Sequence, residues 1–187
     1  GKPLWVDLKG RQLRVVDAAV PPYTEVRLSH CIKVNTPVDA YFSDGRERVR
    51  VMAVDGDRLI LEDGPRRLVG PGESVNIIDP SLEIEGTLTG RDQLYLEAMR
   101  ELGMRQVMLS YVESPDDPAE VRKLLPEAEV RLKIETSGGL DYAREYRHAH
   151  GGLVAARGDL YVEVLRPHKI IGALRTVIEA DPGAIVA

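Results

Sequence analysis

Short apolar runs and helical segments alternate along the second half of the chain, and this alternation restricts the possible folds more than any other feature. The runs that read as strands are RQVMLSYV, EVRLKIET, GGLVAARG and GAIVA. The segments between them have the spacing of amphipathic helices, as in SPDDPAEVRKLLPE, LDYAREYRHAH and PHKIIGALRTVIEA. Repeated β/α units of this length predict parallel strands that are covered by helices.

The first of these helices is expected in TGRDQLYLEAMRELGM. Thr89 is a suitable N-cap, because its hydroxyl can accept a hydrogen bond from an amide of the first turn. Leu94, Ala98, Met99 and Leu102 have the spacing of one helical face, and a glycine typical of a helix end follows them. We therefore expect these four side chains to form the buried face of the helix.

Residues 15–86 have a different sequence pattern, in which short runs typical of β-strands are separated by turn residues. The stretch VMAVDGDRLIL, with apolar runs on both sides of Asp55 and Gly56, predicts a hairpin. The apolar run LWVDL near the N-terminus reads as one more strand of the β/α part. The sequence thus predicts a (β/α) domain made of residues 1–14 and 87–187, interrupted by a compact antiparallel β domain of residues 15–86.

Five expected parallel strands are fewer than the eight that close a (β/α)8 barrel, which typically takes about 250 residues. The predicted fold class is therefore α/β: a partial TIM barrel interrupted by a small antiparallel β-barrel domain. The chain starts abruptly on a strand and ends inside an apolar run. Both ends predict that it is a portion of a longer protein.

Charged residues stand directly at the ends of two expected strands: Lys133 and Glu135 on one, Arg157 and Asp159 on the next. Charged groups are rarely buried unless they are paired or bound to a metal, and barrel active sites lie at the carboxyl ends of the strands. Two neighbouring carboxylates could bind Mg²⁺, and Lys133 lies on the same side of its strand as Glu135. The structural alternative is a salt-bridge cluster at the rim of the barrel.

Composition excludes several functional classes. A formal net charge of −5 gives no general attraction to nucleic acid or to an anionic membrane surface. The single cysteine, Cys31, cannot form an internal disulfide, and no Cys/His cluster has the spacing of a zinc site. No apolar run reaches the roughly 18 residues of a transmembrane helix. We expect a cytoplasmic protein without nucleic-acid or membrane partners.

Several quoted stretches together resemble pyruvate kinase, in the same order along the chain. The most specific are LSYVES followed by EVRKLL, RLKIETSGGLD, and LVAARGDLYVEV. VDLKGRQLR resembles a barrel strand of the family followed by the entry into its mobile lid domain. Two stretches, SDGRERVRVMAV and GESVNI, resemble segments of that lid. LTGRD resembles the return of the chain to the barrel. The resemblance implies transfer of a phosphoryl group between phosphoenolpyruvate and ADP, giving pyruvate and ATP in glycolysis.

The resemblance also implies roles for residues near the strand ends. Glu135 and Asp159 match the family's ligands for Mg²⁺ or Mn²⁺, and Lys133 matches the lysine beside the transferred phosphoryl group. The backbone amides of Gly158 and Asp159 would bind the substrate carboxylate, with the hydroxyl of Thr136 nearby. For Thr136, a helix-capping or turn role is an equal alternative.

Four further residues match the family less specifically. Asp7 corresponds to an acidic residue that helps to hold a monovalent cation, K⁺, and Arg14 to an arginine that contacts phosphate. Ser110 would line the same mouth, and Asp44 corresponds to an aspartate of the nucleotide lid. The structural alternatives are a turn cap for Asp7, a solvated charge for Arg14 and a hydroxyl bonded to the backbone for Ser110.

The sequence departs from the family at several positions. Glu73 stands where the lid has a lysine near the nucleotide phosphates, so it would repel a phosphate. Ser43 replaces an acidic residue, Tyr161 replaces a glycine, and Gln12 leaves the K⁺ requirement open. These departures keep two alternatives in view: a metal-dependent aldolase or lyase with a similar barrel, and a catalytically degenerate homologue with a binding or regulatory role.

Two further expectations concern the chain as a whole. The family's arginine, asparagine and serine motif would precede Gly1 and its threonine beside the enolate would follow Ala187, so the chain alone is not expected to be an active kinase. The exposed sheet edges of an incomplete barrel predict self-association into a homo-oligomer.

Overall fold

The structure is a computed structural model that describes residues 3–43, 45–164 and 167–187. The chain divides into two compact units. One contains Gly1–Arg11 and Thr87–Ala187 and is called the α/β unit below; the other contains Gln12–Gly86 and is called the β unit.

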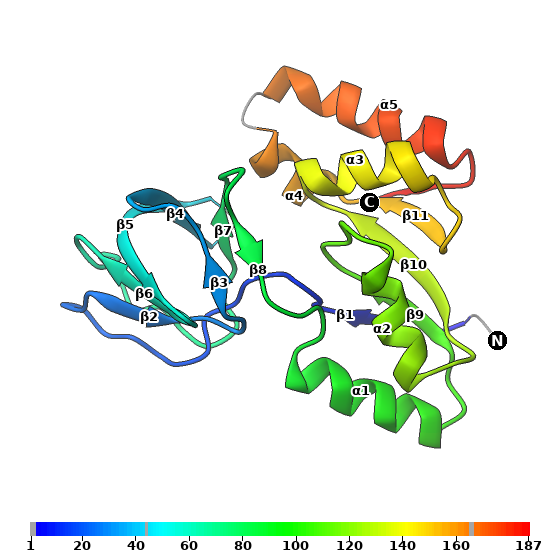
Figure 1. Ribbon diagram of the computed structural model, residues 1–187, viewed down its shortest axis with the longest axis horizontal. Helices are drawn as coiled ribbons and strands as arrows, with labels where there is room; N and C mark the ends of the chain where they lie inside the picture. Colours follow the sequence, from blue (N-terminus) through cyan, green and yellow to red (C-terminus); the bar gives the residue numbers. More distant parts are fainter. Residues whose placement is uncertain (1–2, 44, 165–166) are drawn as a thin grey trace. The chain divides into compact units, whose positions relative to one another are not determined.

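The α/β unit is built on a five-stranded parallel sheet (Figure 1). Its strands are β1 (Val6–Leu8), β9 (Gln106–Leu109), β10 (Glu129–Ile134), β11 (Gly152–Ala155) and β12 (Ile185–Val186). They are hydrogen-bonded to one another in the order in which they occur along the chain. The predicted parallel arrangement of the five apolar runs is therefore confirmed, whereas a closed barrel is not formed by the described strands.

Helices connect the strands after β1. They are α1 (Gly90–Glu101), α2 (Asp116–Leu124), α3 (Ser137–Tyr146), α4 (Arg157–Glu163) and α5 (Ile170–Ala180), and a short 3-10 helix, η1 (Pro167–Lys169), precedes α5. Each parallel crossover needs such a connection, because the chain must return to the same edge of the sheet before the next strand begins.

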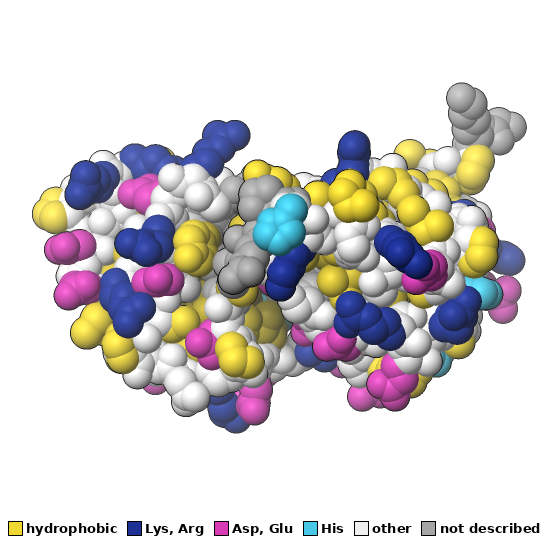
Figure 2. Space-filling view, turned by 90° about the horizontal axis from the view of Figure 1, so that it is seen from above, with side chains coloured by type: hydrophobic (Ala, Val, Ile, Leu, Met, Phe, Trp, Pro, Cys, Tyr) yellow, Lys and Arg dark blue, Asp and Glu magenta, His cyan; other side chains and the backbone are white. Residues whose placement is uncertain are grey.

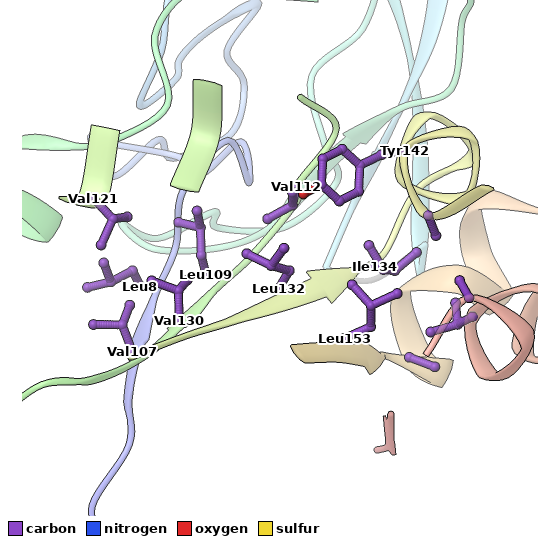
Figure 3. Close-up of a cluster of buried hydrophobic side chains, with 14 of the residues drawn as sticks. Leu8, Val107, Leu109, Val112, Val121, Val130, Leu132, Ile134, Tyr142 and Leu153 are labelled. Carbon is purple, nitrogen blue, oxygen red and sulfur yellow. The ribbon is translucent and has the colours of Figure 1, made fainter. Parts of the chain in front are cut away.

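One face of the parallel sheet forms the core with the helices. Figure 3 shows buried side chains from this cluster: Leu8, Val107, Leu109, Val130, Leu132, Ile134 and Leu153 from strands, with Val112, Val121 and Tyr142. Burial alternates along β10, so its remaining side chains, including Lys133, lie on the other face of the sheet. Alternation thus separates the packed face from the face that carries charge.

Helix α1 begins as predicted, but of the four side chains expected in the core only Met99 is buried. The Thr89 hydroxyl accepts a hydrogen bond from the Asp92 amide at 3.1 Å, which forms the expected N-cap. Leu94 and Leu102, expected in the core, are 65% and 74% exposed, whereas Leu96 is fully buried. The cause is Asp92, whose buried carboxylate binds the backbone of the loop after β1 and thereby fixes the rotation of the helix.

Helix α4 corrects the predicted position of Asp159. The sequence placed Arg157 and Asp159 at the end of a strand, but β11 ends at Ala155 and both residues belong to the first turn of α4. The helix has seven residues and includes Gly158, so its propensity is weak and its periodicity too short to detect. Arg157 donates from its Nε to the Ala187 carbonyl at 3.0 Å.

The β unit is an antiparallel structure whose main sheet curls on itself in Figure 1. Its strands are β2 (Glu25–Arg27), β3 (Ile32–Lys33), β4 (Val38–Phe42), β5 (Glu47–Asp55), β6 (Arg58–Leu61), β7 (Val75–Ile77) and β8 (Glu83–Ile84). The five-stranded sheet has the order β2-β6-β5-β4-β7, and β3 pairs with β8. The predicted hairpin is confirmed, since Asp55 pairs with Arg58 and Gly56 has a φ of 60° in the turn.

The face of the molecule in Figure 2 carries Lys and Arg side chains interspersed with Asp and Glu. It has no extended area of one sign, in agreement with the modest net charge. Every helix within the described ranges is too short or too polar to cross a lipid bilayer.

Candidate active site

The ends of three neighbouring strands bring four polar side chains together. Asp7 lies on β1, Lys133 on β10 and Ser110 directly after β9, while Glu135 follows β10. Because the strands are parallel and paired in the order β1-β9-β10, their carboxyl ends lie at one edge of the sheet. The cluster therefore occupies the edge where α/β barrels place their chemistry.

The ammonium group of Lys133 is at the centre of this cluster. Its Nζ lies 3.0 Å from Glu135 Oε1 and 3.3 Å from Asp7 Oδ1, and it donates a hydrogen bond to Ser110 Oγ at 2.9 Å. Burial alone would lower the pKa of Lys133, but the charges of Glu135 and Asp7 outweigh it and raise this pKa. The lysine is therefore held in its charged form.

Glu135 is the most deeply buried member of the cluster, with 1% of its surface exposed. One carboxylate oxygen faces Lys133, and the other accepts a hydrogen bond from the Tyr111 amide at 2.7 Å. Burial raises the pKa of Glu135 to about 7; the charge of Lys133 acts against this rise and that of Asp159 adds to it. A carboxylate in this position gains stability from any additional cation.

Asp159 approaches the cluster from α4. Its Oδ1 accepts a hydrogen bond from the Tyr111 hydroxyl at 3.4 Å, and its charge contributes to the raised pKa of Glu135. Gly158 and Asp159 occupy the second and third positions of α4, where backbone amides have no partner within the helix. Lys133, Glu135 and Asp159, the three residues singled out for chemistry, thus belong to one electrostatic cluster.

The donor set suits a hard cation that needs few protein ligands. Within the described ranges, no three or more His, Cys, Asp and Glu side chains are placed to share a metal ion. Mg²⁺ is usually bound through one or two carboxylates, with substrate oxygens and water completing the shell. Glu135 and Asp159 supply two carboxylates of this kind, and the charge of Asp159 adds to the rise that burial causes in the pKa of Glu135.

Two predicted site residues have structural partners as well. Thr136 is the N-cap of α3: its hydroxyl accepts a hydrogen bond from the Gly139 amide at 2.9 Å and donates one to Glu113. Asp7, besides contacting Lys133, lies 3.1 Å from the Lys9 ammonium group. The contacts of Thr136 are those of the helix-capping role that the sequence left open.

The remaining predicted residues belong to the β unit. The guanidinium group of Arg14 donates to Gln12 Oε1 and, at 2.7 Å, to the Gly72 carbonyl. Both acceptors are neutral, so Arg14 retains its full positive charge. Asp44, the expected lid aspartate, lies outside the described residues.

Glu73 stands where the family has a lysine, and in the structure it pairs with Arg67. The sequence motifs did not indicate this partner. Arg67 Nη2 lies 2.7 Å from Glu73 Oε2, the Gly70 amide donates to Glu73 at 2.8 Å, and the Ser43 hydroxyl donates to it as well. The hydrogen bond from Arg67, helped by those from Ser43 and Gly70, lowers the pKa of Glu73 to about 2 although burial opposes this. Arg67 Nε also lies 3.2 Å from Glu47 Oε2, so one cation is shared by two carboxylates and compensates the charge of Glu73 only in part.

Two buried aspartates near the site were not anticipated. Asp117 accepts hydrogen bonds from Arg11 Nε at 2.8 Å and from the Thr87 hydroxyl at 2.7 Å. Asp92 accepts from the amides of Lys9 and Gly10 at 2.9 and 3.2 Å. The position of each aspartate in a first helical turn was a possible signal for its hydrogen bonds to nearby residues, but the partners named here are distant in sequence.

Comparisons with known proteins bear on this arrangement. No protein-family model matches the chain. A pyruvate kinase of Agrobacterium vitis is 33% identical over 144 residues, which are 76% of this chain. A pyruvate kinase of Methanocaldococcus jannaschii is 27% identical over 176 residues, or 85% of the chain, and one of Borreliella burgdorferi is 29% identical over 126 residues, or 65%. The chain is related to the pyruvate kinases.

The relationship to the pyruvate kinase family, expected from the sequence motifs, is thereby confirmed. The chain spans only part of these relatives: the matched regions are 30%, 39% and 26% of the pyruvate kinases of A. vitis, M. jannaschii and B. burgdorferi.

Proposed function

We propose that the α/β unit carries part of the catalytic centre of a pyruvate kinase, which transfers a phosphoryl group between phosphoenolpyruvate and ADP. The observation that carries this proposal is the cluster around Lys133. A partly buried ammonium group lies within 3.3 Å of two carboxylates, at the carboxyl edge of a parallel sheet. Phosphoryl transfer depends on positioning and on compensation of charge, and this cluster provides both.

Each residue has a role that follows from its chemistry. Glu135 and Asp159 would hold Mg²⁺ or Mn²⁺, and the bound ion would supply positive charge next to the transferred group. Lys133, kept charged by its neighbours, would donate a hydrogen bond to a phosphoryl oxygen. The amides of Gly158 and Asp159 at the start of α4 would bind the substrate carboxylate.

Other residues would act at the margins of the site. Ser110, which accepts a hydrogen bond from Lys133, would line the mouth, and Thr136 would offer its hydroxyl there in addition to capping α3. Asp7 would contribute to a K⁺ site, while Arg14 would contact a substrate phosphate. Asp44 would belong to the nucleotide lid.

The unit organisation supports a fold proposal. We propose that residues 1–14 and 87–187 form part of a TIM barrel and that residues 15–86 are its lid domain. Strands that pair in chain order, without a reversal, are typical of a barrel, whereas doubly wound sheets reverse their order at a switch point. The proposed compartment is the cytoplasm, and the proposed assembly is a homo-oligomer.

Two residues that differ from the family's pattern, Glu73 and Tyr161, give the alternative functions less support than the sequence alone suggested. An aldolase or lyase, or a degenerate regulatory homologue, was favoured by Glu73, because a negative charge would repel a nucleotide phosphate. The ion pair with Arg67 compensates that charge only in part, because Arg67 also pairs with Glu47. Tyr161, the other departure, is 52% exposed on α4. The partial compensation by Arg67 weakens the argument from Glu73 against the kinase.

The test measures ADP-dependent formation of pyruvate from phosphoenolpyruvate with Mg²⁺, using the longer protein if these residues are part of one. Lys133→Met and Glu135→Ala should each lower kcat by roughly 10²-fold or more, in the range for loss of a preorganised charged group. Lys123→Met is the matched control, because Lys123 is exposed on α2, and it should retain normal turnover. Normal turnover in both site variants would contradict the proposal.

A further inference from the structure

Tyr111 touches both carboxylates of the proposed metal site. Its amide donates a hydrogen bond to Glu135 Oε2 at 2.7 Å, and its hydroxyl donates one to Asp159 Oδ1 at 3.4 Å. The two acids come from different parts of the unit, since Glu135 follows β10 and Asp159 belongs to α4. One residue therefore links them through two separate donors, without adding negative charge between them.

The backbone of Tyr111 is unusual in a way that makes this link possible. Its φ is 56°, a left-handed conformation that a bulky side chain rarely adopts. In an extended strand, the side chains of Ser110 and Tyr111 would point to opposite faces. The left-handed turn breaks this alternation, so that Ser110 contacts Lys133 while Tyr111 reaches Glu135 and Asp159.

Burial shields the hydrogen bond between Tyr111 and Glu135 from water. Tyr111 is 7% exposed and Glu135 1%, so water competes little for the hydrogen bond between them. Two carboxylates that approach each other in such surroundings repel, and each gains from a donor that fixes its direction. Polar groups that orient metal ligands in this way commonly affect metal affinity without touching the ion.

We propose that Tyr111 is a positioning residue that holds Glu135 and Asp159 in the arrangement in which both can bind one divalent cation. The inference rests on the proposed function, because it assigns Tyr111 a role toward the metal proposed there. The amide fixes Glu135, whereas the hydroxyl fixes Asp159. Removal of the hydroxyl should therefore loosen Asp159 alone and leave the ring, the backbone turn and the bond to Glu135 in place.

The direct test is Mn²⁺ binding to Tyr111→Phe, followed through the electron paramagnetic resonance signal of free Mn²⁺. The Kd should rise roughly tenfold, at the lower end of the range for loss of a ligand-orienting hydrogen bond because this bond is long. Tyr161→Phe is the matched control, since it removes an exposed hydroxyl from the helix of Asp159, and its Kd should be unchanged. The Tm without metal should be the same in all three proteins.

A double variant separates this role from simple packing. If the hydroxyl acts through Asp159, Tyr111→Phe should weaken Mn²⁺ binding no further in an Asp159→Asn background. An unchanged Kd in Tyr111→Phe, or an additional loss in the double variant, would overturn the positioning role while leaving the metal site intact. If Mn²⁺ binds the wild type no better than Glu135→Ala, the proposed metal site itself is wrong and the inference is overturned with it.

Discussion

Replacement of Asp117 should markedly lower the stability of the α/β unit. Its side chain is fully buried. One carboxylate oxygen accepts hydrogen bonds from Arg11 Nε and the Thr87 hydroxyl, and the other accepts them from the amides of Glu113 and Ser114, both at 2.9 Å. Arg11 and Thr87 flank the β unit in the sequence, so this carboxylate ties together the two places where the chain leaves and re-enters the α/β unit.

The magnitude follows from the number of bonds that Asp117→Asn would break. Asparagine has the same size but one acceptor oxygen, so either Arg11 and Thr87 or the two amides would face its NH₂ group. Hydrogen bonds to charged groups contribute about 1.5–3 kcal/mol each, and breaking a buried ion pair costs about 3–5 kcal/mol. The side chain of Arg11 is 23% exposed and can recover some hydration. We expect a loss of about 3 kcal/mol, which corresponds to roughly 6–12 °C in Tm.

Urea unfolding followed by tryptophan fluorescence measures this loss of stability, because the tryptophan lies in the same structural unit as Asp117. Trp5 is the only tryptophan of the chain, and it lies in the α/β unit with Arg131 above its ring at 5.1 Å. Asp116→Asn is the matched control, because it removes the same charge from an exposed neighbouring position, and its effect should stay within about 0.5 kcal/mol. Equal stabilities of the two variants would refute the assigned role of Asp117.

Two other predictions concern the β unit and α1. The pKa of Glu73 is lowered from its usual range to about 2, so its negative charge stabilises the folded state fully above pH 4.5. We expect a contribution of roughly 1–2 kcal/mol, because Glu73 is partly exposed. This contribution should be lost as the pH falls toward 2. Thermal unfolding followed by circular dichroism should show a smaller loss between pH 5 and pH 3 in Glu73→Gln than in wild type; equal losses would contradict the assignment. Thr89→Ala should lower the stability of the α/β unit by about 1 kcal/mol in urea unfolding, since it removes an N-cap, and Thr89→Ser should restore most of it. An unchanged unfolding midpoint in Thr89→Ala would show that the cap contributes nothing.

The sequence was sufficient to predict the parallel strands and most helices, because apolar runs and caps are local signals. Thr89 marked the start of α1, yet of the expected buried face only Met99 is buried. Leu94 and Leu102 have the correct spacing, but Asp92 binds amides that are 82 and 83 residues earlier in the chain and turns Leu96 inward. The rotation of a helix therefore depended on a tertiary contact that no local pattern reveals.

The proximity of Lys133 to Glu135 was predictable from the sequence, whereas other contacts around them were not. The spacing of Lys133 and Glu135 indicated neighbouring side chains, and their groups lie 3.0 Å apart. The short helix that carries Asp159 was missed, and so was Tyr111, whose role depends on a left-handed φ that its residue type does not suggest. A strained conformation is decided by the surrounding structure rather than by the residue itself.

The most direct test of the account is a crystal structure of the protein with Mn²⁺, in which the ion is located by its anomalous scattering. The account predicts a peak bound by carboxylate oxygens of both Glu135 and Asp159 at about 2.0–2.3 Å, in the range of hard cations with oxygen ligands. The Lys133 ammonium group should lie beside it, free to contact a phosphoryl oxygen. A peak bound elsewhere, or carboxylates of Glu135 and Asp159 too far apart to share an ion, would contradict the central claim.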